Sequence, residues 1–243
     1  MKKASNGAQA KKGKSPRNGA DVPEGTMIGV ILDRSGSMES CLEATIAGFN
    51  QFLRTQQRDA KGGRALMSLT QFDDCFEVNF VGEAIENVPK LDTRSYVPRG
   101  STALHDAIGR TIRETEAWVR EHGWKDRVLI LIITDGQENA SEEYDLRAVR
   151  ALIKRKERAG WNFAYMGANQ DSFAVGGAMG VRAGFTHNYA ATPAGVIGTF
   201  AALADTTSRY RNARMRGLAA PSFFDTPTEQ TDPAAGKLMP KGR

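Results

Sequence analysis

Two apolar runs of strand length, each followed at once by an aspartate, constrain the fold of this chain more than any other feature. Residues 27–32 lead into Asp33, and residues 127–134 lead into Asp135. Apolar runs without polar alternation are typical of strands that are buried on both faces of a parallel sheet. Ligands bind to such sheets in the crevice at the carboxyl ends of the strands. We therefore expect the two aspartates to lie together at that edge.

Hydroxyl side chains accompany both aspartates. Ser35 and Ser37 alternate with Asp33, so one extended turn can direct all three side chains at one point, and Gly36 lets the backbone bend. Thr102, at the start of a predicted helix, supplies a third hydroxyl. Oxygen ligands of this kind suit a hard cation such as Mg²⁺ or Mn²⁺. Because Mg²⁺ takes roughly six oxygens, at least one position stays available for an acidic group from another molecule. The predicted metal ligands are Asp33, Ser35, Ser37, Thr102 and Asp135.

Each of these segments alone has a simpler interpretation. Asp-x-Ser-x-Ser is also a common turn or helix N-cap, and Thr-Asp-Gly after a strand is commonly a plain turn. All three segments, however, fall at predicted strand-to-helix junctions, and this shared placement favours the metal site.

At these residues the chain resembles the von Willebrand factor type A family. The metal-ion-dependent adhesion site (MIDAS) of that family reads Asp-x-Ser-x-Ser, then a distant Thr, then a distant Asp, and all five positions match here. The resemblance covers roughly residues 25–216. It implies a doubly wound α/β domain, a bound Mg²⁺ and a binding role rather than an enzymatic one. Asp73, Asp74 and Glu138 are also similar to family positions, but we do not expect them to be ligands.

The order of predicted elements independently indicates an α/β fold with a doubly wound, mostly parallel sheet and helices on both faces. Residues 65–72 and 75–80 are strands joined by Asp73-Asp74, and they predict an antiparallel hairpin that makes one edge of the sheet. The first and fourth strands are expected side by side at the centre. Helices are predicted at 39–58, 103–122, 141–159, 172–179 and 192–215, further strands at 161–167 and 184–188, and irregular structure at 82–100.

The charge of the chain is concentrated at one end. Six Lys or Arg and no acidic residue lie in residues 1–20, so the formal net charge of +5 becomes −1 for the remainder. We predict a disordered basic tail at 1–25, one domain at 26–216 and an unstructured tail at 217–243. Within the second tail, Phe223 and Phe224 either pack back on the domain or form a short docking segment.

The sequence also predicts a location in the cytoplasm. No apolar run follows the first lysines as in a signal peptide, and no run reaches the length of a membrane span. Cys41 and Cys75 are too few and too far apart for a disulfide framework, and we expect them to be buried or partly buried thiols.

The expected function is a Mg²⁺-dependent protein-interaction module that binds an acidic residue of a partner. An alternative is a nucleic-acid-associated protein that acts through its basic tail, although the tail has no aromatic side chains for base stacking. Four arginines, at 209, 211, 214 and 216, are expected to cap a helix C-terminus rather than to bind phosphate.

A metal-dependent phosphatase is the less favoured enzymatic reading. Ser35 stands where the common Asp-x-Asp arrangement has its second carboxylate, and Arg34 is expected to point to solvent beside the site. We therefore expect no enzymatic activity, no catalytic residue and no cofactor other than the metal.

Overall fold

The computed structural model describes residues 25–124, 127–168, 171–218 and 222–224. Its middle layer is a six-stranded sheet in the order β3-β2-β1-β4-β5-β6. All neighbouring strands are parallel except β2 and β3, which form the predicted antiparallel hairpin at one edge. The strands are β1 (Gly25–Asp33), β2 (Arg64–Phe72), β3 (Phe76–Ala84), β4 (Arg127–Thr134), β5 (Asn162–Ala168) and β6 (Thr186–Tyr189).

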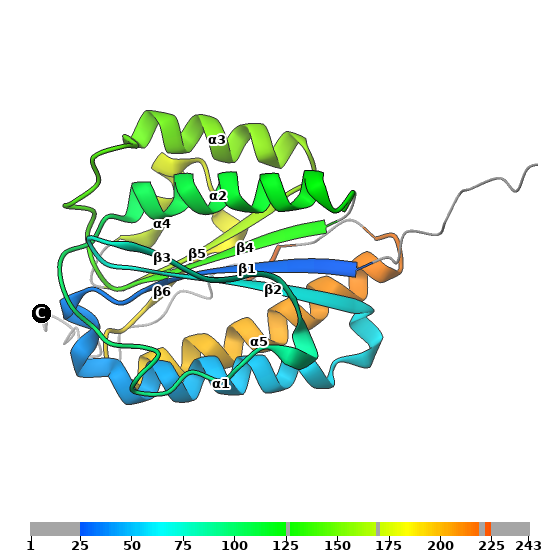
Figure 1. The fold of residues 1–243 in the computed structure, drawn as a ribbon, viewed down its shortest axis with the longest axis horizontal. Coiled ribbons are helices and arrows are strands. Elements are labelled where there is room, and N and C mark those ends of the chain that lie inside the picture. The colour runs from blue at the N-terminus through cyan, green and yellow to red at the C-terminus, as the bar shows by residue number, and fades with distance from the viewer. Residues whose placement is uncertain (1–24, 125–126, 169–170, 219–221, 225–243) are drawn as a thin grey trace, which may run out of the picture.

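Helices cover both faces of the sheet (Figure 1), which confirms the doubly wound α/β architecture. Helices α1 (Leu42–Arg58) and α5 (Pro193–Met215) pack side by side on one face. The other face carries α2 (Leu104–Glu121), α3 (Leu146–Arg158) and α4 (Ser172–Met179). No helix of the described ranges is long and apolar enough to cross a membrane.

The two central strands explain the unbroken apolar runs of the sequence. β1 and β4 lie next to each other, every residue of β1 is buried, and only Arg127 of β4 is partly exposed. Gly29 permits this close pairing, since a Cβ on Gly29 would lie 2.6 Å from the Ile130 side chain. Both strands run in the same direction, so Asp33 and Asp135 emerge at the same edge of the sheet, as predicted.

Some element boundaries differ from the predicted ones. The first helix begins as a 3-10 turn over Gly36–Cys41, and only the part from Leu42 is α-helical. β3 extends to Ala84, past the expected end at residue 80. The prediction relied on the alternation of apolar and polar residues, and register shifts opposite residues 67–70 interrupt that alternation. A 3-10 turn, Ala183–Phe185, takes the first part of the predicted last strand.

The hairpin link is also longer than expected. Phe72 pairs with Phe76, so three residues rather than two join β2 to β3, and the Asp73 amide donates to the Cys75 carbonyl at 3.0 Å. Cys75 is consequently exposed, so the expectation that it is at least partly buried was wrong, whereas Cys41 is buried as expected, and both thiols are free.

The predicted basic tail lies outside the described residues, as does most of the predicted C-terminal tail. Phe223 and Phe224 are described, and they pack back on the domain, the first of the two alternatives. Their rings stack on Phe185 and His187, and the Phe224 amide donates to the Gly184 carbonyl at 2.9 Å.

Arg211 does not have the capping role predicted for its cluster. Its side chain is buried between α5 and the end of α1, where it donates to the carbonyls of Gln56 (3.0 Å) and Gly63 (2.9 Å). Burial lowers the pKa of Arg211, and the Asp59 carboxylate, 3.6 Å away, opposes that shift. A helical position that reads as exposed in the sequence therefore faces a neighbouring helix.

Candidate metal centre

Asp33 is held at the end of the central strand β1 by three different segments. Its Oδ1 accepts from the Ser35 amide at 2.6 Å, and its Oδ2 accepts from the Thr134 hydroxyl at the end of β4. Tyr96, from the loop before α2, donates its hydroxyl to the Asp33 carbonyl at 2.7 Å. The Asp33 side chain is fully buried, so its position is fixed by these partners.

The two serines extend from Asp33 to Asp135. The hydroxyl oxygens of Ser35 and Ser37 are 3.2 Å apart, and the Ser37 hydroxyl donates to Asp135 Oδ1 at 2.5 Å. The turn after β1 therefore reaches the turn after β4 through side-chain oxygens alone.

Thr102 lies beside these serine and aspartate side chains, next to Gly136. A Cβ on Gly136 would lie 2.6 Å from Thr102 Oγ1 and 3.4 Å from Ser35 Oγ, so both hydroxyls border the same small space. Only glycine leaves that space open at this position. The structure thus brings all five predicted residues together, and their role as metal ligands stays a prediction.

Main-chain and amide contacts hold the Thr102 loop in place. The side-chain Oδ1 of Asn139 accepts from the Thr102 main-chain amide (2.9 Å), and the main-chain amide of Asn139 donates to the Thr102 carbonyl (3.0 Å). On the other side, the Ala103 amide donates to the Asp73 carbonyl at 2.9 Å. Thr102 is therefore fixed between the loops that follow β2 and β4.

The electrostatics of the site favour a cation. Burial raises the pKa of Asp33 from 3.8 to about 6, although hydrogen bonds from Thr134 and Ser35 oppose the shift. Burial also raises the pKa of Asp135, against the hydrogen bond from Ser37. A divalent ion among these oxygens would relieve the cost of keeping both carboxylates charged. The donor set, which is all oxygen, fits Mg²⁺ or Mn²⁺.

Arg34, expected to point to solvent, is buried instead. Its Nε donates to Asp73 Oδ2 at 3.0 Å and its Nη1 to Glu77 at 2.6 Å. Arg99 donates to the same Asp73 oxygen at 2.8 Å. Although burial raises the pKa of Asp73, hydrogen bonds from Arg99 and the Cys75 amide and the charge of Arg34 lower it overall. The loops after β1 and β4 and the loop before α2 carry the candidate ligands and are called the metal loops below. Asp73 fastens the first of them to the last, through Arg34 and Arg99, a role that the sequence did not reveal.

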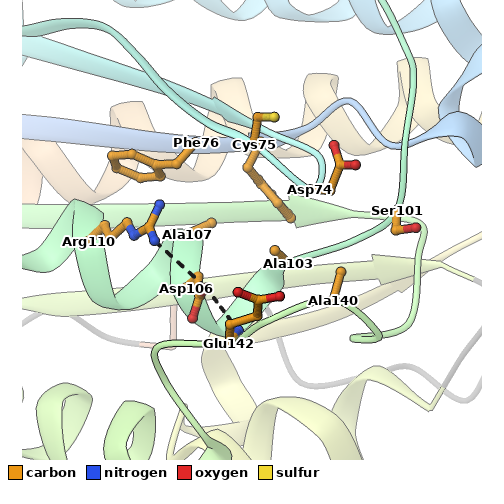
Figure 2. A pocket seen from close by; sticks show the side chains of 11 residues that line it. Asp74, Cys75, Phe76, Ser101, Ala103, Asp106, Ala107, Arg110, Ala140 and Glu142 are labelled. Carbon is orange, nitrogen blue, oxygen red and sulfur yellow. Dashed lines mark hydrogen bonds and ion pairs between the residues drawn. The ribbon is translucent and has the colours of Figure 1, made fainter.

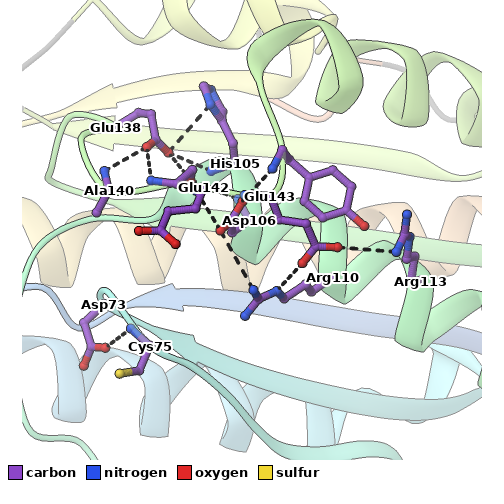
Figure 3. A network of polar contacts seen from close by, with 12 residues as sticks. Asp73, Cys75, His105, Asp106, Arg110, Arg113, Glu138, Ala140, Glu142 and Glu143 are labelled. Carbon is purple, nitrogen blue, oxygen red and sulfur yellow. Dashed lines mark hydrogen bonds and ion pairs between the residues drawn. The ribbon is translucent and has the colours of Figure 1, made fainter.

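Two further carboxylates anchor the loop after Asp135 to the start of α2 (Figure 3). Glu138 accepts from the amides of His105 (2.8 Å) and Ser141 (2.8 Å) and from the Ser141 hydroxyl (2.7 Å). Asp106 accepts from the three successive amides of residues 142–144 at 2.8–3.1 Å. These hydrogen bonds account for the positions of both carboxylates, and the expectation that Glu138 is not a ligand stays a prediction. The sequence signal for Asp106 was its place in the first turn of a predicted helix.

The same contacts explain why α3 begins later than predicted. Ser141, the predicted first residue of the helix, uses its hydroxyl for Glu138. Asp145 caps the helix instead, and its carboxylate accepts from the Ala148 amide at 2.8 Å.

No protein-family model matches the chain, and no curated protein matches it in sequence. Solved structures match it in fold. The pilus adhesin SpaC from Lactobacillus rhamnosus GG, in an open conformation, aligns with a TM-score of 0.55 and 14% identity over 78% of this chain and 30% of that chain. Proximal thread matrix protein 1 from the mussel byssus aligns with a TM-score of 0.53 and 12% identity over 73% of this chain and 46% of its own.

The third structure is a separate domain of matching size. The vWF domain of the type V pili tip protein Mfa5 from Porphyromonas gingivalis aligns with a TM-score of 0.52 and 9% identity, over 77% of this chain and 96% of that domain. This chain therefore spans less than half of the mussel protein and less than a third of SpaC, but nearly all of the Mfa5 domain. The chain has the fold of the von Willebrand factor type A domains, in agreement with its resemblance to that family at the five metal-site positions.

Proposed function

We propose that this chain is a Mg²⁺-dependent protein-interaction module whose metal ion binds the carboxylate of an Asp or Glu on a protein partner. The observation that carries the proposal is the convergence of five oxygen-bearing side chains from three loops at one edge of the sheet. When bound, the ion supplies a positive charge with a coordination position open to the partner. The side chains that would hold it are those of Asp33, Ser35, Ser37, Thr102 and Asp135.

Charge balance supports an acidic partner. Asp33 and Asp135 are the two charged members of the set, so together they neutralise a divalent ion and no more. The three hydroxyls add no charge. A further carboxylate therefore approaches a site without net negative charge, so charge repulsion does not oppose its coordination to the ion.

Hydrogen-bond directions also support metal ligation. Ser37 donates its proton to Asp135 and so accepts from the Ser35 hydroxyl, which leaves one lone pair of the Ser37 oxygen for an ion. Asp33 accepts from a main-chain amide and from Thr134, and these bonds fix its orientation beside the ion. The loops need no large rearrangement to present their oxygens, because Asn139 and Asp73 already hold them.

A binding role is favoured over phosphoryl transfer. The cation nearest in sequence to the site, Arg34, has its Nε and Nη1 committed to Asp73 and Glu77, and its Nη2, which has no partner, is buried. A phosphatase would need such a group free to bind the transferred phosphate. SpaC, which shares the fold, is a pilus adhesin and so itself a binding protein.

The proposal is tested by capturing partners from a cell extract of the source organism with the wild-type protein and with Asp33→Asn, each in Mg²⁺ and in EDTA. Glu86→Gln serves as the matched control, because Glu86 is an exposed acid outside the site. We expect partners that the wild type and the control retain only with Mg²⁺ and that Asp33→Asn does not retain. Identical protein sets in all conditions would contradict metal-mediated recognition.

A further inference from the structure

A pocket of about 480 Å³ lies beside the metal centre, between the β2–β3 link and the start of α2 (Figure 2). It shares its wall with the metal loops. Ser101 and Ala103, which line the pocket, are the chain neighbours of Thr102 on either side. Asp74, also in the wall, follows the Asp73 that fastens those loops. A ligand in the pocket therefore lies next to the chain neighbours of Thr102, one of the proposed metal ligands.

The lining combines an apolar wall with free negative charge. Phe72, Phe76 and Ala103 contribute the apolar part. Asp74 and Glu142 are exposed acids of the rim, and neither forms an ion pair with any residue that the structure describes. The uncompensated charge of the pocket is thus negative.

The one cation of the lining, Arg110, is already engaged. Its Nε donates to Glu143 at 2.9 Å, and its Nη2 lies 4.0 Å from Asp106. Its guanidinium also lies 5.6 Å from the centre of the Phe76 ring. Figure 2 shows Arg110 and Phe76 at one end of the pocket and Asp74 with Ser101 at the other. The acidic end is the end that adjoins the metal loops.

Two other occupants fit less well. A second metal ion at Asp73, Asp74 and Cys75 would need the Asp73 carboxylate, which already accepts from Arg34, Arg99 and the Cys75 amide. An anion would be repelled by the two free carboxylates of the rim.

We propose that this pocket takes the side chain of a Lys or Arg from the same partner segment whose Asp or Glu binds the metal, an inference that rests on the proposed function. The methylene stem of such a side chain packs against the apolar wall while its charged head reaches Asp74 or Glu142. Because the wall residues adjoin Thr102, the acidic and basic residues of the partner lie close together in its sequence. The partner motif is therefore an acid and a base a few residues apart.

The first test uses short peptides that carry one aspartate and one lysine separated by one, two or three glycines. Matched peptides have norleucine in place of lysine, which keeps the stem and removes the charge. Binding is followed by amide NMR shifts of the labelled protein in Mg²⁺ and in EDTA. With Mg²⁺, we expect one lysine spacing to bind about two- to fivefold more tightly than its norleucine match, as for exposed ion pairs. The preference should disappear in the double variant Asp74→Asn/Glu142→Gln, while the norleucine peptide binds as before.

The second test examines the pocket without the metal. Cys75 lines the pocket and is exposed, whereas Cys41 is buried, so iodoacetamide reports on the pocket rim. In EDTA, n-butylammonium should slow the alkylation of Cys75 in the wild type relative to 1-butanol, and should not do so in the double variant. Each rate is converted to the rate constant of the thiolate by a pH profile, because Asp74 raises the pKa of Cys75 and an ammonium ion bound there would oppose that rise and speed the alkylation.

The outcomes separate the two proposals. Equal Mg²⁺-dependent affinity for lysine and norleucine peptides would overturn the pocket assignment and leave the metal-binding proposal standing. Protection of Cys75 by n-butylammonium without Mg²⁺-dependent binding of any peptide would support the pocket as a cation site and contradict metal-mediated recognition of an acid. The absence of protection in the second test would overturn the pocket assignment on its own.

Discussion

Replacement of Asp33 by asparagine should stabilise the metal-free protein at neutral pH. Burial raises the pKa of this carboxyl from 3.8 to about 6 in the folded protein. As the pH rises between these values, the unfolded chain loses the proton first, so the folded state becomes less stable. Above about pH 6 the loss is complete, and it amounts to about 3 kcal/mol, since one pH unit of pKa difference corresponds to about 1.4 kcal/mol.

Asparagine keeps the shape of the side chain and carries no charge, and its Oδ1 can still accept from the Ser35 amide. Its Nδ2 would donate to the Thr134 hydroxyl in place of accepting from it, while that hydroxyl donates to the Gly136 carbonyl 3.2 Å away. In EDTA at pH 8 the free energy of unfolding of Asp33→Asn should therefore exceed that of the wild type by up to about 3 kcal/mol. At pH 4 the gap should close. With Mg²⁺ at a hundred times its dissociation constant the wild type should gain about 2.7 kcal/mol, and the variant should gain far less.

The assay is urea denaturation at pH 4, 6 and 8, in EDTA and in Mg²⁺, with Glu86→Gln as a control that should follow the wild type throughout. Two results would refute the reasoning. One is a variant less stable than the wild type at pH 8 in EDTA, and the other is a gap that does not change between pH 4 and pH 8. Either would mean that the charge of Asp33 is compensated by groups of the protein itself.

Three further substitutions test the architecture around the site. Gly136→Ala places a methyl group 2.6 Å from Thr102 Oγ1, so the thermal shift caused by Mg²⁺ should fall to less than half, and an unchanged shift would contradict the placement of Thr102. Arg211→Met removes the buried donor to the Gln56 and Gly63 carbonyls and leaves Asp59 without its cation, so urea denaturation should show a loss of about 3–5 kcal/mol. Asp106→Asn weakens the acceptor for three amides, and hydrogen exchange of residues 142–144 should quicken at least tenfold while β1 stays protected.

The sequence predicted the parts of the molecule that depend on local pattern. The apolar runs that became β1 and β4 are unbroken because these strands are central, and the same pattern placed Asp33 and Asp135 at one edge. The five candidate metal ligands were predicted from the adhesion-site motif and from the placement of its parts after strands.

Contacts between segments far apart in the chain could not be read in that way. Arg34 looks like an exposed loop residue until Asp73, 39 positions away, is placed beside it. Ser141 and Asp145 are both good N-cap residues, and only the contact of Ser141 with Glu138 decides between them. Arg211 resembles other basic residues near a helix end, and its burial depends on the approach of α1.

The return of Phe223 and Phe224 onto the domain has a consequence for the last strand. β6 forms one border of the sheet, and an uncovered border strand is a template for pairing with a second molecule. The two phenylalanines cover Phe185 and His187 at this border, and the Phe224 amide binds the Gly184 carbonyl just before β6. A chain shortened after residue 216 would lose that cover, and its β6 border would become the place where molecules associate into larger species.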